Sequence, residues 1–205
     1  MGISERKAKE KEDIKALILT AARKLFVEQG IEQTTIRKIA QEIGYSVGTV
    51  YVYYQDKNDI LHDLHSQGFR QLGAAMKVLF DVHDPMERVK ALGRVYLRFA
   101  IENPDMYDLM FSRKAPMDYL DSVHASDWHE GAATFDLLKT TVEECLAHGH
   151  FKGHELEPLS FVIWSAVHGM ASLHISQRLK GVKFQAPETV LLNGYTSLTL
   201  IFDRL

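Results

Sequence analysis

Apolar residues recur every three or four positions along most of the chain, whereas the strict alternation typical of strands is scarce. The sequence therefore predicts an all-α protein. It indicates about nine helices, over residues 10–29, 36–43, 47–53, 57–81, 85–102, 104–112, 128–148, 156–180 and 187–204. The stretch 113–127 lacks a clear period and is predicted to be a loop or a short broken helix.

Composition and charge divide this helical chain into two parts. A hydrophobic share of 46% with 25% charged residues suits a globular protein with a substantial core and excludes a disordered chain. Of the formal net charge of −3, residues 1–57 carry +2 and residues 58–205 carry −5. We therefore expect a small N-terminal domain over 1–57 and a larger one over 58–205. The acidic total excludes a wholly basic nucleic-acid coat but permits a local basic face.

The remaining compositional features favour a protein of the cytoplasm. Cys145 is the one cysteine, so an intrachain disulfide is excluded. The first residues are charged rather than apolar, unlike a signal peptide, and the apolar runs are shorter than a membrane span. We therefore expect no membrane partner.

The most informative segment is Thr35–Lys57, TIRKIAQEIGYSVGTVYVYYQDK. Thr35 is placed to cap a short helix, Gly44 supplies a sharp turn, and Ser46 caps a second helix almost at once. This spacing predicts a helix-turn-helix, whose second helix fits the DNA major groove, although another kind of helical hairpin remains possible. The second helix is rich in β-branched and aromatic residues and has Gly48 in its first turn, so its sequence serves more than helix formation.

The same residues resemble the TetR family of transcriptional regulators. The family's pattern is matched over about 50 residues, from the AARKLFVEQG segment at 21–30 through the following positions: Thr35, Ile39, Ala40, Gly44, Ser46, Gly48, Thr49, Tyr51, Tyr54 and Lys57. Position 54 is more often Phe in the family. The resemblance implies a ligand-responsive DNA-binding regulator, most often a repressor that a small hydrophobic effector releases from a palindromic operator.

The resemblance also implies where DNA is contacted. Thr35, Arg37, Tyr53 and Lys57 are expected at the DNA backbone, Gly48 and Thr49 at the bases, and Tyr51 either at DNA or packed inward. Independently of the family, Lys57 opens a helix whose N-terminal amides favour a phosphate. The candidate DNA-binding residues are Thr35, Arg37, Tyr45, Ser46, Gly48, Thr49, Tyr51, Tyr53 and Lys57.

Residues 47–54 contain no Lys or Arg, so guanine recognition by a bidentate arginine is excluded there. Specificity is then expected from Arg37, Lys38, Tyr45, the DNA shape, or the basic residues of the N-terminal arm. The charged run Glu5–Asp13 is more simply interpreted as a solvated, partly frayed helix start.

The last two predicted helices have the pattern of a dimer interface. Residues 156–180 are apolar around most of the helix, which indicates burial on two sides, and Gly169 in mid-helix suggests close approach of another helix. Together with 187–204 they predict a four-helix interface between two copies, which would present two reading heads to a palindromic site. The pattern of Trp164, His168 and Gly169 also resembles a TetR subgroup named for Trp-His-Gly.

An effector pocket is expected inside the C-terminal bundle, by resemblance to the family. Its candidate residues combine aromatic bulk, adaptable methionine and sparse polarity: Phe99, Met106, Tyr107, Met110, Phe111, Trp128, Phe135, Trp164 and His168. His168 needs a hydrogen-bond partner, either an effector or a buried neighbour.

Other chemistry is not indicated. His148, His150 and His154 cluster near two glycines, but their position at a helix end favours an ordinary polar turn over a metal site. Patterns for a catalytic nucleophile, a bound cofactor or a phosphate loop are absent from the sequence, so we expect no enzyme and no cofactor. The alternative to a regulator is a helical small-molecule-binding protein or enzyme with a vestigial DNA-binding head.

Overall fold

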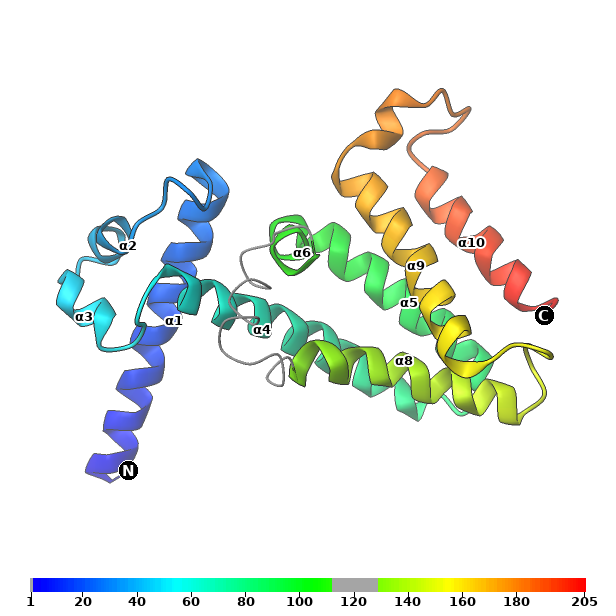
Figure 1. The fold of residues 1–205 in the computed structure, drawn as a ribbon, viewed down its shortest axis with the longest axis horizontal. Helices are drawn as coiled ribbons and strands as arrows, with labels where there is room; N and C mark the ends of the chain where they lie inside the picture. Colours follow the sequence, from blue (N-terminus) through cyan, green and yellow to red (C-terminus); the bar gives the residue numbers. More distant parts are fainter. Residues whose placement is uncertain (1, 112–128) are drawn as a thin grey trace. The chain divides into compact units, whose positions relative to one another are not determined.

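The computed structural model describes residues 2–111 and 129–205. Over these ranges the chain forms nine α-helices and two short 3₁₀ helices and contains no strand. In chain order the elements are α1 (Ile3–Gln29), α2 (Ile36–Glu42), α3 (Val47–Tyr51), α4 (Lys57–Lys77), η1 (Val78–Asp81), α5 (Pro85–Glu102), α6 (Pro104–Phe111), α8 (His129–Ala147), α9 (Leu156–Ile175), η3 (Arg178–Gly181) and α10 (Val190–Phe202) (Figure 1). The predicted all-α fold is confirmed. The expected loop at 113–127 lies outside the described residues.

Helix α1 begins earlier than predicted. The charged run that was expected to fray is helical from Ile3, so that expectation is wrong. The run is rich in Lys and Glu, which have high helix propensity, and the Glu5 carboxylate accepts a hydrogen bond from the Gly2 backbone nitrogen at 2.8 Å. Figure 1 shows these first turns of α1 extending beyond α2 and α3.

Other helices are shorter than predicted at their ends. Helix α3 stops at Tyr51, and α4 passes at Lys77 into η1. Helix α9 stops at Ile175 rather than near residue 180, because Gln177 takes a left-handed conformation with φ of 56° that interrupts the helical hydrogen bonding. Helix α10 begins at Val190, three residues after the expected start.

The described residues fall into two compact units. Residues 2–67 and 109–111 belong to the first, and residues 68–108 and 129–205 to the second. Helix α4 begins in the first unit and ends in the second. The predicted domain boundary after residue 57 stays a prediction.

The first unit is built around the apolar face of α1. Ile18, Ala22, Ile39 and Val50 are buried where α1 packs against α2 and α2 packs against α3. Tyr54 is also buried and keeps its hydroxyl paired by donating to Asp63 at 2.8 Å. These contacts hold the two short helices in a defined orientation although each is too short to be stable alone.

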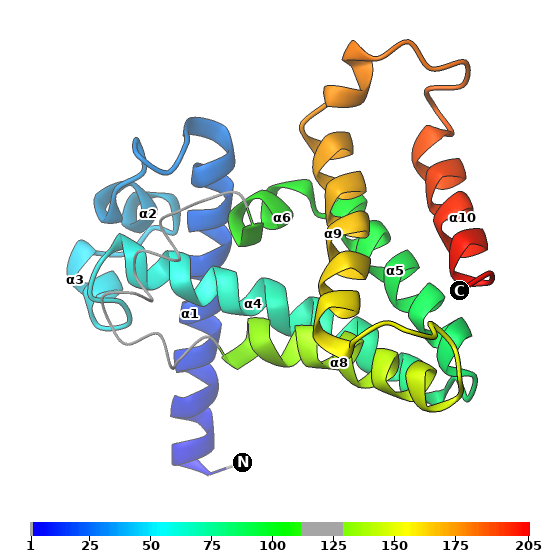
Figure 2. The ribbon, with the colours of Figure 1, turned by 45° about the vertical axis from the view of Figure 1, so that its right-hand side comes forward.

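The second unit has its core between α5, α8, α9 and α10, shown from a second direction in Figure 2. Val89, Val142, Phe151 and Phe202 are buried there, and the rings of Phe151 and Phe202 meet edge to face with centroids 5.8 Å apart. Arg88 is buried at the edge of this core and pairs with Glu144 at 2.8 Å, so its charge is compensated.

Helix α10 is attached to α5 by a polar contact as well as by the core. The Lys90 ammonium group on α5 donates to Glu87 and to Asp203, which follows α10. The Tyr195 hydroxyl on α10 donates to the Lys90 carbonyl oxygen, and the Tyr195 ring lies over Gly93. This part of the second unit therefore depends on a glycine at position 93.

Candidate functional sites: a DNA-reading surface and an aromatic cluster

The helix-turn-helix forms with the predicted caps. The Thr35 hydroxyl accepts from the Lys38 backbone nitrogen at 3.3 Å, and the Ser46 hydroxyl accepts from the Thr49 backbone nitrogen at 3.0 Å. Gly44 between them has φ of +72°, a left-handed value that favours glycine. The sequence-predicted turn and both caps are thus confirmed.

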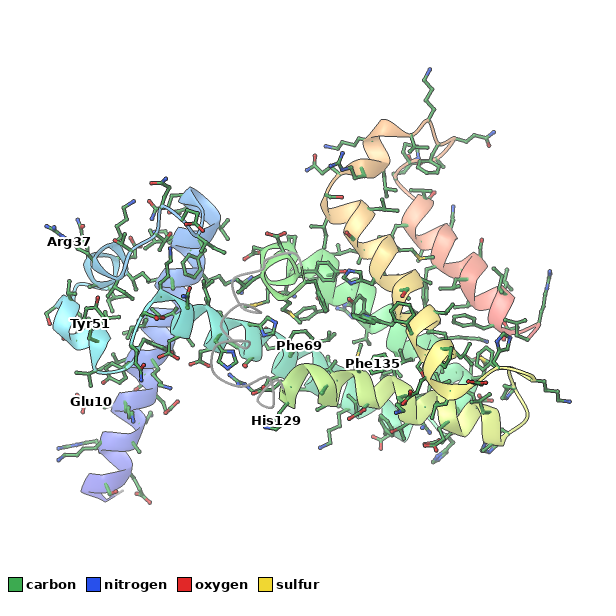
Figure 3. The ribbon with its side chains drawn as sticks, viewed as in Figure 1. Glu10, Arg37, Tyr51, Phe69, His129 and Phe135 are labelled. Atoms are coloured by element: carbon green, nitrogen blue, oxygen red, sulfur yellow. The ribbon has the colours of Figure 1, made fainter. Side chains whose placement is uncertain are left out.

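Helix α3 buries one residue and exposes the opposite face. Val50 is fully buried, whereas Tyr51 is 55% exposed and Val52 is 76% exposed. The inward-packing alternative for Tyr51 is therefore wrong. Figure 3 shows Tyr51 on α3 and Arg37 on the neighbouring α2.

All the predicted DNA-binding residues lie on the surface of this unit. Thr35, Arg37, Tyr45, Ser46, Gly48 and Tyr51 are exposed, and Thr49, Tyr53 and Lys57 are half-buried. Among the described residues, a methyl group on Gly48 would meet only the Ser46 hydroxyl, at 3.6 Å, so their packing does not require glycine at this position.

Two of the basic groups already have partners within the unit. The Lys57 ammonium donates to the Ile31 carbonyl oxygen at 2.8 Å, and the Lys38 ammonium donates to the Gln29 side chain at 2.8 Å and the Gln33 carbonyl oxygen at 2.7 Å. An ammonium has three protons, so neither arrangement prevents a phosphate contact. These bonds hold the Lys57 ammonium group at the start of α4 and the Lys38 ammonium group at α2.

In the second unit His168 lies at the centre of an aromatic cluster. Its Nδ1 is 2.9 Å from the Tyr96 hydroxyl and 2.8 Å from the Tyr107 hydroxyl. The Trp164 ring is 5.7 Å from the imidazole, centroid to centroid, and the Phe135 ring meets Trp164 at 5.8 Å. Figure 3 marks Phe135 on α8. The hydrogen-bond partner expected for His168 is supplied by buried tyrosines of the chain itself.

Burial determines the protonation of this cluster. It lowers the pKa of His168, which favours the neutral imidazole at pH 7. It raises the pKa of Tyr96, and it raises the pKa of Tyr107 to about 12. The site therefore offers neutral hydrogen-bonding groups among aromatic rings, without a formal charge.

The structure brings together only part of the predicted effector set. Tyr107, Phe135, Trp164 and His168 are in contact, while Tyr96, which sequence reasoning missed, is their further polar member. A histidine on an apolar helix face indicates that it has a polar partner, but Tyr96 and His168 are separated by 72 positions in the sequence, so the sequence does not identify the partner.

The other predicted effector residues are placed as follows. Phe99 and Met106 are buried in the second unit, and Met110 and Phe111 belong to the first unit. Trp128 lies outside the described residues. Their contact with an effector stays a prediction.

Helices α9 and α10 carry large apolar side chains that the other described residues leave exposed. These are Phe161, Val162, Leu173, Leu192, Leu200 and Ile201. Gly169 and Gly194 both lie in these helices, and no described residue comes within 4 Å of a methyl group added at either one, so packing among residues 2–111 and 129–205 requires neither glycine. By length and composition α9 is also apolar enough to cross a membrane, which the sequence reading had excluded.

Comparison with known proteins assigns both units. Residues 18–64 match the family described as bacterial regulatory proteins, tetR family, and residues 89–194 match the tetracyclin repressor-like C-terminal domain. The second match alone spans more than half of the chain. The chain belongs to the TetR family. The expectation of a non-enzymatic, DNA-binding regulator is confirmed at the level of this family.

Curated relatives of this TetR-family protein are also transcriptional regulators. A helix-turn-helix regulator of Haemophilus influenzae is 27% identical over 95 residues, which cover 46% of this chain and 51% of the relative. The regulator HbdR of Aromatoleum is 54% identical over 44 residues, 22% of this chain and 19% of HbdR. The alignment with the Haemophilus relative thus spans about half of that protein.

Solved structures share the fold over nearly the whole TetR-family chain. A Rhodococcus protein of unknown function has a TM-score of 0.75 at 23% identity, covering 93% of both chains. A TetR-family regulator of Syntrophomonas wolfei has a TM-score of 0.70 at 23% identity, covering 94% of this chain and 96% of the other. At this identity the likeness establishes the fold.

Proposed function

We propose that this TetR-family protein is a dimeric repressor that binds a palindromic operator in the cytoplasm and is released by a small hydrophobic effector. The observation that carries the proposal is the surface of α2 and α3, where every predicted DNA contact is solvent-accessible and α3 is held by its Ser46 cap. A helix presented in this way fits the major groove, and the neighbouring cations Arg37, Lys38 and Lys57 suit the phosphates.

The contacts are proposed residue by residue. Thr35, Arg37, Tyr53 and Lys57 contact the DNA backbone, and Gly48, Thr49, Tyr45 and Tyr51 approach the bases. Ser46 acts by holding Thr49, since its hydroxyl lies 2.9 Å from the Thr49 hydroxyl.

The uncovered face of α9 and α10 supports dimerisation. A mid-helix glycine costs about 1 kcal/mol relative to alanine, and no contact among the described residues offsets this cost at Gly169 or Gly194. Close approach by the same helices of a second copy would use both glycines and bury the apolar residues beside them. A second copy in water explains this face without a membrane, and two-fold symmetry matches a palindromic operator.

The aromatic cluster supports an effector site of low polarity. Tyr96, Tyr107 and His168 are neutral at pH 7, and Trp164 and Phe135 add apolar rings that are only half-buried. We place the effector against these rings, with a few hydrogen bonds to the polar groups.

The test is selection of the purified full-length protein against random duplex DNA, followed by fluorescence anisotropy on the selected sequence at two salt concentrations. A palindromic winner, bound with strong salt dependence and clear preference over scrambled DNA, is expected. Weak, sequence-blind binding at both salt concentrations would favour the alternative of a small-molecule-binding protein with a vestigial head.

A further inference from the structure

Helix α3 presents aliphatic side chains, rather than charged ones, to whatever it binds. Val47 is 38% exposed and Val52 is 76% exposed, and the segment from Tyr45 to Gln55 contains no charged residue. At about 100° per residue, positions 47, 48, 51 and 52 share an arc of about 140° opposite the buried Val50. The two valines therefore flank Gly48 and Tyr51 on the outward face.

The polar groups of this helix are partly occupied within the chain. The Ser46 hydroxyl accepts from the Thr49 backbone nitrogen at 3.0 Å and lies 2.9 Å from the Thr49 hydroxyl. Gly48 adds no side chain to the same face, so a surface can come close to the valine methyl groups on either side. What the face offers at short range is mainly apolar.

One feature of the major groove matches an apolar probe. Each base pair presents donors and acceptors there, but only thymine presents a methyl group, at C5. A guanine would need a bidentate donor that this segment lacks. Burying valine methyl groups against the thymine methyl is favourable, whereas placing them on a polar base edge leaves that edge without its water.

We infer that Val47 and Val52 read thymine methyl groups in the major groove of each operator half-site. This inference rests on the proposed function, because it assumes that α3 enters the groove. The two valines then determine part of the sequence specificity, and replacement of thymine at the positions that they contact weakens binding.

The experiment uses the operator selected by the full-length protein. Each thymine of a half-site is replaced singly by deoxyuridine, which removes the C5 methyl group and leaves base pairing intact, and the dissociation constant is measured by anisotropy at one fixed salt concentration. At one or two positions of the half-site we expect the dissociation constant to rise about fourfold, the effect of one buried methyl group.

Variants assign the effect to the two side chains. Val47→Ala and Val52→Ala are each expected to bind the thymine operator about sixteenfold more weakly, about fourfold for each of the two half-sites. Each variant should also lose the distinction between thymine and deoxyuridine at the position that the valine reads. Val27→Ala is the matched control, because Val27 is 60% exposed on α1, outside the helix-turn-helix. It should bind like the wild type and retain the full deoxyuridine effect.

Failure of this inference is distinct from failure of the proposed function. If the wild type selects a palindrome but tolerates deoxyuridine everywhere, or if both valine variants keep the full deoxyuridine effect, the valines do not read thymine, although the protein is still a regulator. If the wild type selects no sequence at all, the proposed function itself is wrong and the inference fails with it.

Discussion

Replacement of Gly93 by alanine tests how α10 is attached to the second unit. A methyl group built on Gly93 would overlap the Tyr195 hydroxyl oxygen and would lie 2.9 Å from two carbons of the Tyr195 ring. These separations are far below van der Waals contact. The Tyr195 ring is buried and its hydroxyl is bound to the Lys90 carbonyl oxygen, so it cannot move aside without breaking that hydrogen bond.

The expected magnitude follows from three opposing effects. Alanine is favoured over glycine in a helix by about 1 kcal/mol. Overpacking of a core costs about 1–3 kcal/mol, and leaving the buried tyrosine hydroxyl without its partner costs about 1–3 kcal/mol more. Gly93→Ala should therefore lower the free energy of unfolding by about 1–5 kcal/mol, even though helix propensity alone predicts a gain.

The assay is urea denaturation followed by circular dichroism, at one protein concentration because dimerisation contributes to stability. Tyr195→Phe is the companion variant, since it removes the hydroxyl oxygen that makes the shortest contact. The double variant should lose less unfolding free energy than the sum of the losses of the two single variants, because Tyr195→Phe relieves part of the clash that Gly93→Ala creates. A Gly93→Ala variant as stable as the wild type would refute the placement of the Tyr195 ring over Gly93.

Three further outcomes are expected. Thr49→Ala should weaken operator binding with some loss of specificity, whereas Lys57→Ala should weaken binding to all sequences about equally and reduce the salt slope by about one unit per half-site; unchanged anisotropy titrations for both would contradict these assignments. Val162→Glu should raise the dimer dissociation constant at least about tenfold in sedimentation equilibrium, because it places a charge in the proposed apolar interface. The control Ile101→Glu changes an exposed apolar residue on α5 and should leave the dimer dissociation constant unchanged. The reverse result would exclude α9 from the interface. Burial lowers the pKa of His168, so the imidazole is protonated in the unfolded state before the folded state as the pH falls through about 6.5, and the free energy of unfolding should decrease below that pH. In parallel urea titrations His168→Gln should show a smaller decrease. Equal decreases in the wild type and the variant would show that His168 does not titrate in this way.

Much of the helix-turn-helix could be predicted from the sequence, because its caps and its turn depend on residues only a few positions apart. The Thr35 and Ser46 caps act on backbone nitrogens three residues away, and Gly44 takes its left-handed conformation within the same turn. Such signals are visible in a few consecutive residues. Helix α5 kept its predicted bounds for the same reason, since Asp84 accepts from the Met86 and Glu87 backbone nitrogens at the start of the helix.

Helix ends without such local signals were predicted less well. The charged start of α1 has neither a core contact nor a strong stop, and its helix propensity decided that it continues to Ile3. Conversely, Leu179, four positions after Ile175, suggested a longer α9, but the backbone turns at Gln177. Periodicity reports which face is apolar and carries little information about where the backbone leaves the helix.

The helical class, the capped helix-turn-helix and the neutral face of α3 could be predicted from the amino-acid sequence, because each depends on residue types at short spacing. Packing of distant helices established that Tyr96 joins Tyr107 at His168, that Gly93 accommodates Tyr195, and that no described residue packs onto Gly169. These contacts join helices that are distant in sequence, and many pairings of apolar faces satisfy the same periodicity. Side-chain volume and the need to pair buried polar groups select one of them, and both act only once the helices are packed together.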